Sequence, residues 1–408
     1  MSEAPVDRKR AQSLMAAAGL DALILFQPEH VSYAAGINPG VAALFRRAGA
    51  ASVLVPADPS LSVAAVMPDL AAGAARASGA SVDVAYHRIW VDTATVNAHD
   101  PDTPLARVVS DRPQPPRPAN FDTGVSFGLL GEQLRARGLG KARLGADLGF
   151  VPAADLPLLE AALPHAVIVD GTDAIRRLRM VKTSAEIERL RIAVELSEAG
   201  LRACLAAIRT GIERPALSAA YAEAVHAAAA ARATPVGLWD YISVGPDPWG
   251  AGKPAGTGDI LKFDIGVVVG GYSSDMARTV AFGAPSRAAR ELHAALLAGL
   301  EAGLARLGPG VRLADVHTVM LAAVRSRGVP GYARGHFGHS LGNDPFSEQW
   351  PFIAADSDVA AEPGMVLAVE SPYYVDGLGG FIIEDQVLVT SDGIELMSRH
   401  PRELQVYD

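Results

Sequence analysis

The chain has 408 residues, half of them hydrophobic and a fifth charged, so it can bury more than one core and is not a disordered protein. Its 36 basic and 45 acidic residues give a net charge of −9, which argues against nucleic acid or an anionic membrane as a partner. Cys204 is the single cysteine, which excludes an internal disulfide and cysteine-rich zinc modules and predicts a reducing, cytoplasmic setting. The first ten residues lack an apolar core and no run of about 18 uncharged apolar residues occurs, so neither a signal peptide nor a membrane span is expected.

The first 170 residues or so alternate between helical and strand patterns. Arg8–Gly19 predicts a short helix ended by glycine, and the apolar run Asp21–Phe26 has the length of a strand. The segment Asp111–Pro118 contains four prolines, which forbid a helix or a central strand, so an exposed loop is expected there. Further strands are predicted at Ala51–Val55, Leu61–Met67, Arg88–Val91 and Ala166–Val169.

A domain boundary is expected at Asp170-Gly171, which gives an N-terminal domain of residues 1–170 and a second domain of residues 171–408. Thr183-Ser-Ala-Glu186 has the spacing of a capping box and begins a helical apolar period that ends at Gly211. Hairpins separated by Ala-rich helices then predict an α+β second domain. Its strands are predicted at Ile260–Val269, Tyr272–Phe282, Met365–Glu370 and Phe381–Val389.

The first of these hairpins contains two aspartates in otherwise apolar strands. Gly270-Gly271 is a two-residue turn signal, and in that register Asp264 and Asp275 share one face as diagonal neighbours. A turn at Val269-Gly270 would set them directly opposite, still on one face. Two carboxylates aimed at one point repel unless a proton or a cation lies between them. Taken alone, the pair fits a metal site and water-facing aspartates equally well.

A second hairpin adds two glutamates. A turn centred on Gly377 would place Glu370 opposite Glu384, again in apolar strands. Between the two hairpins, Arg334-Gly-His-Phe-Gly-His-Ser-Leu-Gly342 contains the glycine-flanked pair His336 and His339. A neutral imidazole among oxygen ligands suits manganese, iron, cobalt or zinc better than calcium or magnesium.

The order of these residues resembles that of the pita-bread metallohydrolases, a family that includes methionine aminopeptidase, Xaa-Pro aminopeptidase, prolidase and the metal-free creatinase. Leu20–Phe26 and Val31–Gly36 resemble runs of the creatinase/prolidase N-terminal domain, and Arg177–Arg191 resembles its linker. The resemblance implies an α+β protein with a pita-bread catalytic domain behind an α/β creatinase-type N-terminal domain. The family's five ligands match Asp264, Asp275, His339, Glu370 and Glu384.

The resemblance also implies a mechanism and a cofactor. Two divalent ions, manganese before iron, cobalt or zinc, would be bound with Asp264 on one ion, His339 and Glu370 on the other, and Asp275 and Glu384 bridging. Such a pair activates a shared water and polarises the scissile carbonyl. Glu370 resembles the proton shuttle, and His336 is the second catalytic candidate. Relatives of the creatinase and prolidase type also lead us to expect a homodimer in which one N-terminal domain helps to close the partner's site.

Three accessory positions depart from the peptidase pattern. The histidine usually found about 17 residues before the first aspartate is absent, and Asp247 or Trp249 stands near its place. Phe346 occupies the position of a second histidine, and Ile382 that of an arginine. The side chains expected to contact substrate are therefore Trp249, Arg334, Asp344, Phe346 and Ile382, with His336 beside them.

Three functions follow from these residues. The first is a dinuclear metallopeptidase of the prolidase or Xaa-Pro aminopeptidase type that acts on short peptides. The second keeps the metal centre but acts on a small non-peptide molecule, by C–N hydrolysis or by elimination. The third, a non-catalytic binding module, ranks last because all five ligand positions are intact. Family frequency places the peptidase slightly ahead, although the missing histidine and arginine favour another amide.

Overall fold

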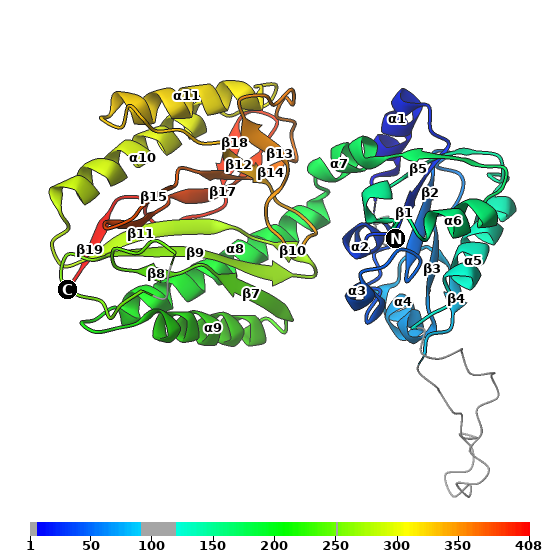
Figure 1. The fold of residues 1–408 in the computed structure, drawn as a ribbon, viewed down its shortest axis with the longest axis horizontal. Helices are drawn as coiled ribbons and strands as arrows, with labels where there is room; N and C mark the ends of the chain where they lie inside the picture. Colours follow the sequence, from blue (N-terminus) through cyan, green and yellow to red (C-terminus); the bar gives the residue numbers. More distant parts are fainter. Residues whose placement is uncertain (1–5, 91–119, 250–251) are drawn as a thin grey trace, which may run out of the picture. The chain divides into compact units, whose positions relative to one another are not determined.

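The computed structural model describes residues 6–90, 120–249 and 252–408, which belong to two compact units, Met1–Leu178 and Arg179–Asp408 (Figure 1). The sequence places the domain boundary after Asp170, but the first unit continues into the next helix because Ala174, Ile175 and Leu178 pack into its core. The loop expected at Asp111–Pro118 lies outside the described residues.

The first unit is a six-stranded sheet in the order β4-β3-β2-β1-β5-β6, with β1 antiparallel to β2 and parallel to β5. Its strands are β1 (Ala22–Leu25), β2 (Ser52–Pro56), β3 (Ala64–Pro68), β4 (Asp83–His87), β5 (Arg143–Ala146) and β6 (Val167–Asp170). Its helices are α1 (Arg8–Ala18), α2 (Pro28–Ala35), α3 (Ala42–Phe45), α4 (Ala72–Ser78), α5 (Thr123–Ala136), α6 (Leu156–Ala162) and α7 (Thr172–Met180).

Helices cover both faces of this sheet, which explains why β1 reads as a continuous apolar run. Leu23 and Leu25 pack with α1, α2 and α7, whereas Ala22 and Ile24 pack with α5 and α6. The helix expected at Arg8–Gly19 is confirmed, and Gly19 ends it in the left-handed conformation at φ 63°.

One strand prediction in this unit is wrong. The strand expected at Arg88–Val91 lies earlier in the chain, at β4, and among the described residues of that stretch, 88–90, Ile89 forms an isolated bridge. β4 is an edge strand with a half-exposed burial pattern, so its residues lack the apolar run from which strands were predicted.

The second unit is built on one eleven-stranded sheet and a two-stranded ribbon, with α8 and α9 on one side of the large sheet and α10 and α11 on the other (Figure 1). The helices are α8 (Ser184–Ala207), α9 (Arg214–Ala231), α10 (Arg287–Arg306) and α11 (Leu313–Ser326). The strands are β7 (Val236–Asp240), β8 (Ser243–Val244), β9 (Ile260–Val269), β10 (Tyr272–Ser273), β11 (Met276–Phe282), β12 (His336–Ser340), β13 (Gln349–Ala354), β14 (Val366–Glu370), β15 (Tyr373–Val375), β16 (Gly379–Phe381), β17 (Glu384–Val389), β18 (Ile394–Leu396) and β19 (Gln405–Tyr407).

The hairpin registers confirm the two predicted turns. Val269 pairs with Tyr272 around Gly270-Gly271, both at positive φ, and further along the ladder Asp264 pairs with Ala277. Glu370 pairs directly with Glu384 between β14 and β17. The α8 capping box is also present.

The strand predicted at Tyr272–Phe282 is divided into β10 and β11 by two residues, Ser274 and Asp275. The Ser274 hydroxyl accepts the Val267 N–H at 3.0 Å and donates to the Val267 carbonyl at 3.2 Å, so side-chain bonds replace part of the regular ladder. The break changes the direction of the backbone at Asp275.

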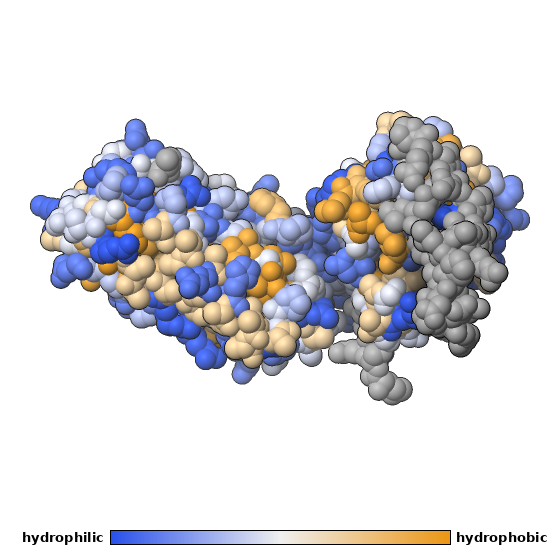
Figure 2. Space-filling model, turned by 90° about the horizontal axis from the view of Figure 1, so that it is seen from below, coloured by the Kyte–Doolittle hydropathy of each residue, from blue (hydrophilic) through white to orange (hydrophobic). Residues whose placement is uncertain are grey.

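The surface of the second unit has no dominant apolar band on the side drawn in Figure 2, where charged and apolar side chains are interspersed. Among the helices in the described part of the chain, none combines the length and the apolar character needed to cross a bilayer.

Candidate metal centre

The alternation of β9 explains how the first carboxylate reaches the site. Phe263 and Ile265 belong to the core beneath α8 and α9, so Asp264 between them points to the opposite face of the sheet. Asp275, His339, Glu370 and Glu384 come from the β10–β11 break, from β12, and from the facing ends of β14 and β17. All five expected ligands line one cavity of about 300 Å³.

Three of the five side chains are closest together. One ligand atom from each of Asp275, His339 and Glu384 lies within 4.8 Å of the others. His339 Nε2 is 3.7 Å from Asp275 Oδ2 and 3.8 Å from Glu384 Oε1. Asp264 and Glu370 complete the lining without joining this closest group.

Burial and mutual repulsion shape the titration of these groups. Burial, reinforced by the neighbouring carboxylates, raises the pKa of Asp275 and of Glu384 well above the usual range. Burial likewise raises the pKa of Asp264 to about 7, although Lys262 opposes this shift. Burial lowers the pKa of His339, which favours the neutral imidazole that binds metal.

The residues present fit a divalent metal. Asp275 Oδ1 is buried and has no hydrogen-bond partner, which is costly for a carboxylate oxygen unless a cation satisfies it. The surrounding donors are carboxylate oxygens and one imidazole nitrogen, a set suited to divalent first-row metals.

Glu370 is the one ligand already bonded to positively charged or titratable neighbours. Arg334 Nη2 donates to Glu370 Oε1 at 2.8 Å, and His336 Nδ1 lies 3.3 Å from the same oxygen. His336 Nε2 is in turn 3.7 Å from Glu348 Oε2. Both His336 and Arg334 were predicted near the site, and both contact the same oxygen of Glu370, Oε1.

The substrate-contact predictions separate into two groups. Trp249, Arg334, Phe346 and Ile382 line the cavity, whereas Asp344 is not among the lining residues and accepts the Phe346 N–H at 3.1 Å. Six further lining residues were not predicted from the sequence. Only Trp239 and Tyr241 gave a local signal, because these two aromatic residues alternate at the end of β7. The six are Trp239, Tyr241, Pro345, Ser347, Glu348 and Tyr374.

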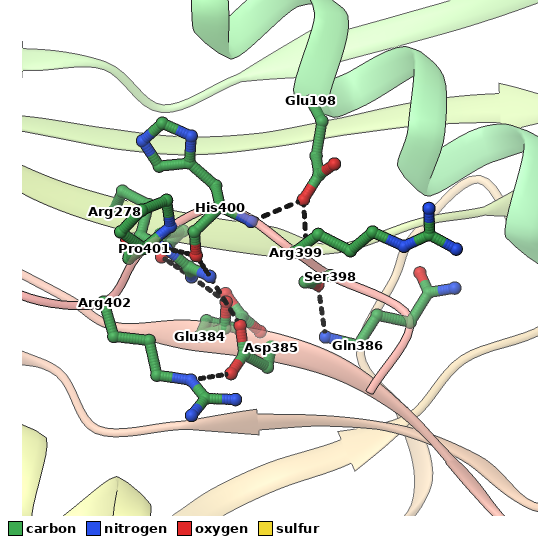
Figure 3. A network of polar contacts seen from close by, with 11 residues as sticks. Glu198, Arg278, Glu384, Asp385, Gln386, Ser398, Arg399, His400, Pro401 and Arg402 are labelled. Carbon is green, nitrogen blue, oxygen red and sulfur yellow. Dashed lines mark hydrogen bonds and ion pairs between the residues drawn. The ribbon is translucent and has the colours of Figure 1, made fainter. Parts of the chain in front are cut away.

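A buried polar network supports the strand of Glu384 from behind (Figure 3). Arg278 donates to the Glu384 carbonyl at 2.6 Å and to Asp385 Oδ1 at 2.6 Å, and Arg402 pairs with the other oxygen of Asp385. Arg278 also donates to the carbonyl of His400, which ties the C-terminal segment to β11 and β17. Arg278 therefore makes a structural ion pair with Asp385, and it contacts the cavity-lining residue Glu384 through the backbone carbonyl and not through the carboxylate.

This network predicts a large stability effect away from the cavity. Asp385→Ala should lower the free energy of unfolding of the second unit by about 3–5 kcal/mol, because it leaves the buried Arg278 without a counter-charge. The control Glu395→Ala removes a half-exposed pair with Arg191 and should cost about 0–1 kcal/mol. Urea unfolding of both variants measures the difference, and equal losses would show that the network contributes little.

The curled sheet, the cavity with four carboxylates and an imidazole, and the separate α/β unit together define a metal-dependent hydrolase with a creatinase-type N-terminal domain. Residues 188–391, half of the chain, match the metallopeptidase family M24, and residues 8–181 match the Creatinase/Prolidase N-terminal domain. The chain belongs to metallopeptidase family M24.

Named relatives agree with this assignment. The chain is 26% identical over 289 residues to the uncharacterized peptidase YqhT of Bacillus subtilis, covering 69% of this chain and 77% of that protein. It is 26% identical over 234 residues to the Xaa-Pro dipeptidase of Pyrococcus furiosus, covering 57% and 67%. The crystal structure of dipeptidase PepE from Mycobacterium ulcerans superposes with a TM-score of 0.74 at 26% identity, covering 98% of this chain and 96% of that one.

Proposed function

We propose that this protein hydrolyses the amide bond of dipeptides and closely related short substrates, using two divalent ions at the cavity. The observation that carries the proposal is the convergence of the five side chains, each from a different strand or strand break, on one cavity. The Xaa-Pro dipeptidase and the dipeptidases among the relatives support a short peptide as substrate.

The residues divide between holding the ions and moving a proton. Asp264, Asp275, His339, Glu370 and Glu384 would hold the ions, with Asp264 serving one, His339 and Glu370 the other, and Asp275 and Glu384 both. When bound, the ions lower the pKa of a water molecule and polarise the scissile carbonyl. The donor set favours manganese, then iron, cobalt or zinc.

Glu370 is the proposed proton carrier. Its Oε1 is bonded to Arg334 and lies next to His336, so the carboxylate is held in one orientation while it takes a proton from the attacking water and passes it to the leaving amine. His336 joins Glu370 to Glu348 and can stabilise the charge on either carboxylate.

The cavity wall suggests which dipeptides fit. It is largely aromatic, with Trp239, Trp249, Phe346 and Tyr374, and Ile382 adds an aliphatic surface. Phe346 and Ile382 offer no side-chain hydrogen-bond donors, so recognition that depends on such donors is weakened.

We therefore expect weak turnover of simple Xaa-Pro dipeptides relative to another amide. Steady-state kinetics of the metal-loaded protein on Ala-Pro and Leu-Pro, on dipeptides with a large apolar second residue, and on small non-peptide amides would measure this preference. A kcat/KM on Ala-Pro or Leu-Pro near the ~10⁴ M⁻¹s⁻¹ lower end typical of enzymes would restore ordinary prolidase function. Turnover of non-peptide amides alone would instead favour the second function considered from the sequence.

We also propose that the protein forms a homodimer, on the basis of the family resemblance, and that it is cytoplasmic, on the basis of its single buried cysteine. The molar mass in solution tests the first.

A further inference from the structure

Lys262 is a buried ammonium that lies over two aromatic rings but has no anionic partner among the described residues. It lies on β9, two residues before Asp264 and on the same face of the strand, and only 1% of its surface is exposed. In the part of the chain that the structure describes, its Nζ has neither a hydrogen-bond acceptor nor an ion-pair partner, and Asp264 acts on it only through space. A buried charge is costly unless it is paired, so this ammonium lacks the anion its position calls for.

A second donor without an acceptor lies beside it. Ser243 on β8 is the cross-strand neighbour of Lys262, and its buried hydroxyl has no hydrogen-bond partner. Gly380 keeps this corner open, because a Cβ there would lie 3.1 Å from both Lys262 Cδ and Ser243 Oγ. An ammonium and a hydroxyl that both lack acceptors make a small anion-binding corner.

Two aromatic rings separate this corner from the cavity. Lys262 Nζ lies 5.0 Å from the Trp249 ring centroid and 5.1 Å from that of Tyr374, and both residues line the cavity that contains Asp264. Trp249 is 65% exposed, so a ligand can reach Lys262 by displacing a ring whose buried contacts are the ammonium and the Tyr374 ring, 4.1 Å away between centroids.

The wall residue next to this corner carries no charge. Ile382 lies there, because its backbone bonds the hydroxyl of Thr279, and Thr279 is the cross-strand partner of Lys262 on β11. Arg334, a cation that lines the cavity, already forms an ion pair with Glu370, although its buried Nε has no acceptor. Of these two cations, Lys262 is the one without a carboxylate partner among the described residues.

We propose that Lys262, assisted by Ser243, binds the carboxylate of the substrate at the Trp249–Tyr374 wall of the cavity. In a dipeptide this is the C-terminal carboxylate. Lys262 would therefore select substrates in which a single residue follows the scissile bond. The inference rests on the proposed dipeptide substrate, and the experiment separates the two.

The test compares a dipeptide with its C-terminal amide, using wild type, Lys262→Met, Lys262→Arg and Ser243→Ala at equal metal content. Lys262→Met should raise KM for the dipeptide about 10- to 100-fold and change that for the amide by less than about twofold. Lys262→Arg should retain part of the preference because it keeps the charge, and Ser243→Ala should shift KM in the same direction by a smaller factor. Lys141→Met, an exposed lysine of the first unit, serves as the control and should change neither value.

Two outcomes would overturn the proposal. An equal loss of kcat on both substrates would mean that Lys262 only supports Asp264, and unchanged kinetics would mean that it is a packing residue. If wild type cleaves no dipeptide, the proposed function fails, but calorimetry with N-acetyl-leucine and its amide still tests the corner. Wild type should then prefer the acid about tenfold or more and Lys262→Met should lose this preference, whereas a preference that survives in the variant refutes the role of Lys262.

Discussion

Asp275→Ala is expected to abolish binding of both metal ions and with it all hydrolysis. The Asp275 side chain lies 3.7 Å from His339 Nε2 in the tightest part of the cluster, and we propose that it serves both ions, so its removal would weaken the binding of each. Metal analysis of the dialysed protein measures the stoichiometry directly.

The same variant should have the opposite effect on the metal-free protein. Asp275 Oδ1 is buried without a hydrogen-bond partner, and neighbouring carboxylates repel the side chain. Removing this side chain should therefore stabilise the metal-free fold. We expect metal-free Asp275→Ala to unfold at a higher temperature than metal-free wild type. With manganese at 100 times its Kd, wild type should gain about 2.7 kcal/mol and the variant close to nothing, so the order of stabilities reverses.

Asp315→Ala provides the matched control, because Asp315 lies on α11 in the same unit and pairs with Arg312 at the surface. It should keep the full metal content. An Asp275→Ala protein that retained two ions and its activity would show that the β10–β11 break does not build the centre.

The ligand cluster could be predicted from the sequence because its geometry is set locally. A two-glycine turn fixes the register of β9 with β10 and β11, and a symmetrical turn around Gly377 fixes that of β14 with β17. Once the register is known, the face on which each carboxylate lies follows from the alternation of a strand. The separation of Asp275 from β11 did not follow, because it depends on the bonds that the Ser274 side chain makes.

The cavity wall could not be predicted in the same way. Tyr374 and Glu348 reach the site from the β15–β16 ribbon and from the loop before β13, and only the packing of these elements brings them near Asp264. Their own segments look like ordinary strand or loop sequence. The prediction of the edge strand β4 was wrong for a related reason, since a half-exposed strand lacks a strong apolar pattern.

Arg334 shows how a correct residue can take a different role. It was expected to contact substrate because it precedes the histidine pair, and it does line the cavity, but its guanidinium is bonded to Glu370. The arginine thus fixes the orientation of the carboxylate on which the proposed proton transfer depends. Because of this contact, Glu370 is the second residue whose substitution should have a large effect on turnover.

Glu370→Gln should lower kcat by about 10²- to 10⁴-fold while the fold survives, because the amide has nearly the same shape but cannot carry a proton. Glu370 is also a proposed ligand, so metal content must be measured in the same samples and the rates compared at full occupancy.

A matched control separates this role from a general loss of charge. Glu395→Gln changes a glutamate of the same sheet whose partner is Arg191 at the surface, and it should leave kcat and the pH profile unchanged. If fully metal-loaded Glu370→Gln turned over near the wild-type rate, Glu370 would be a ligand only. The proton would then have to pass through another group. His336 is the side chain placed to accept it, because it contacts both Glu370 Oε1 and Glu348.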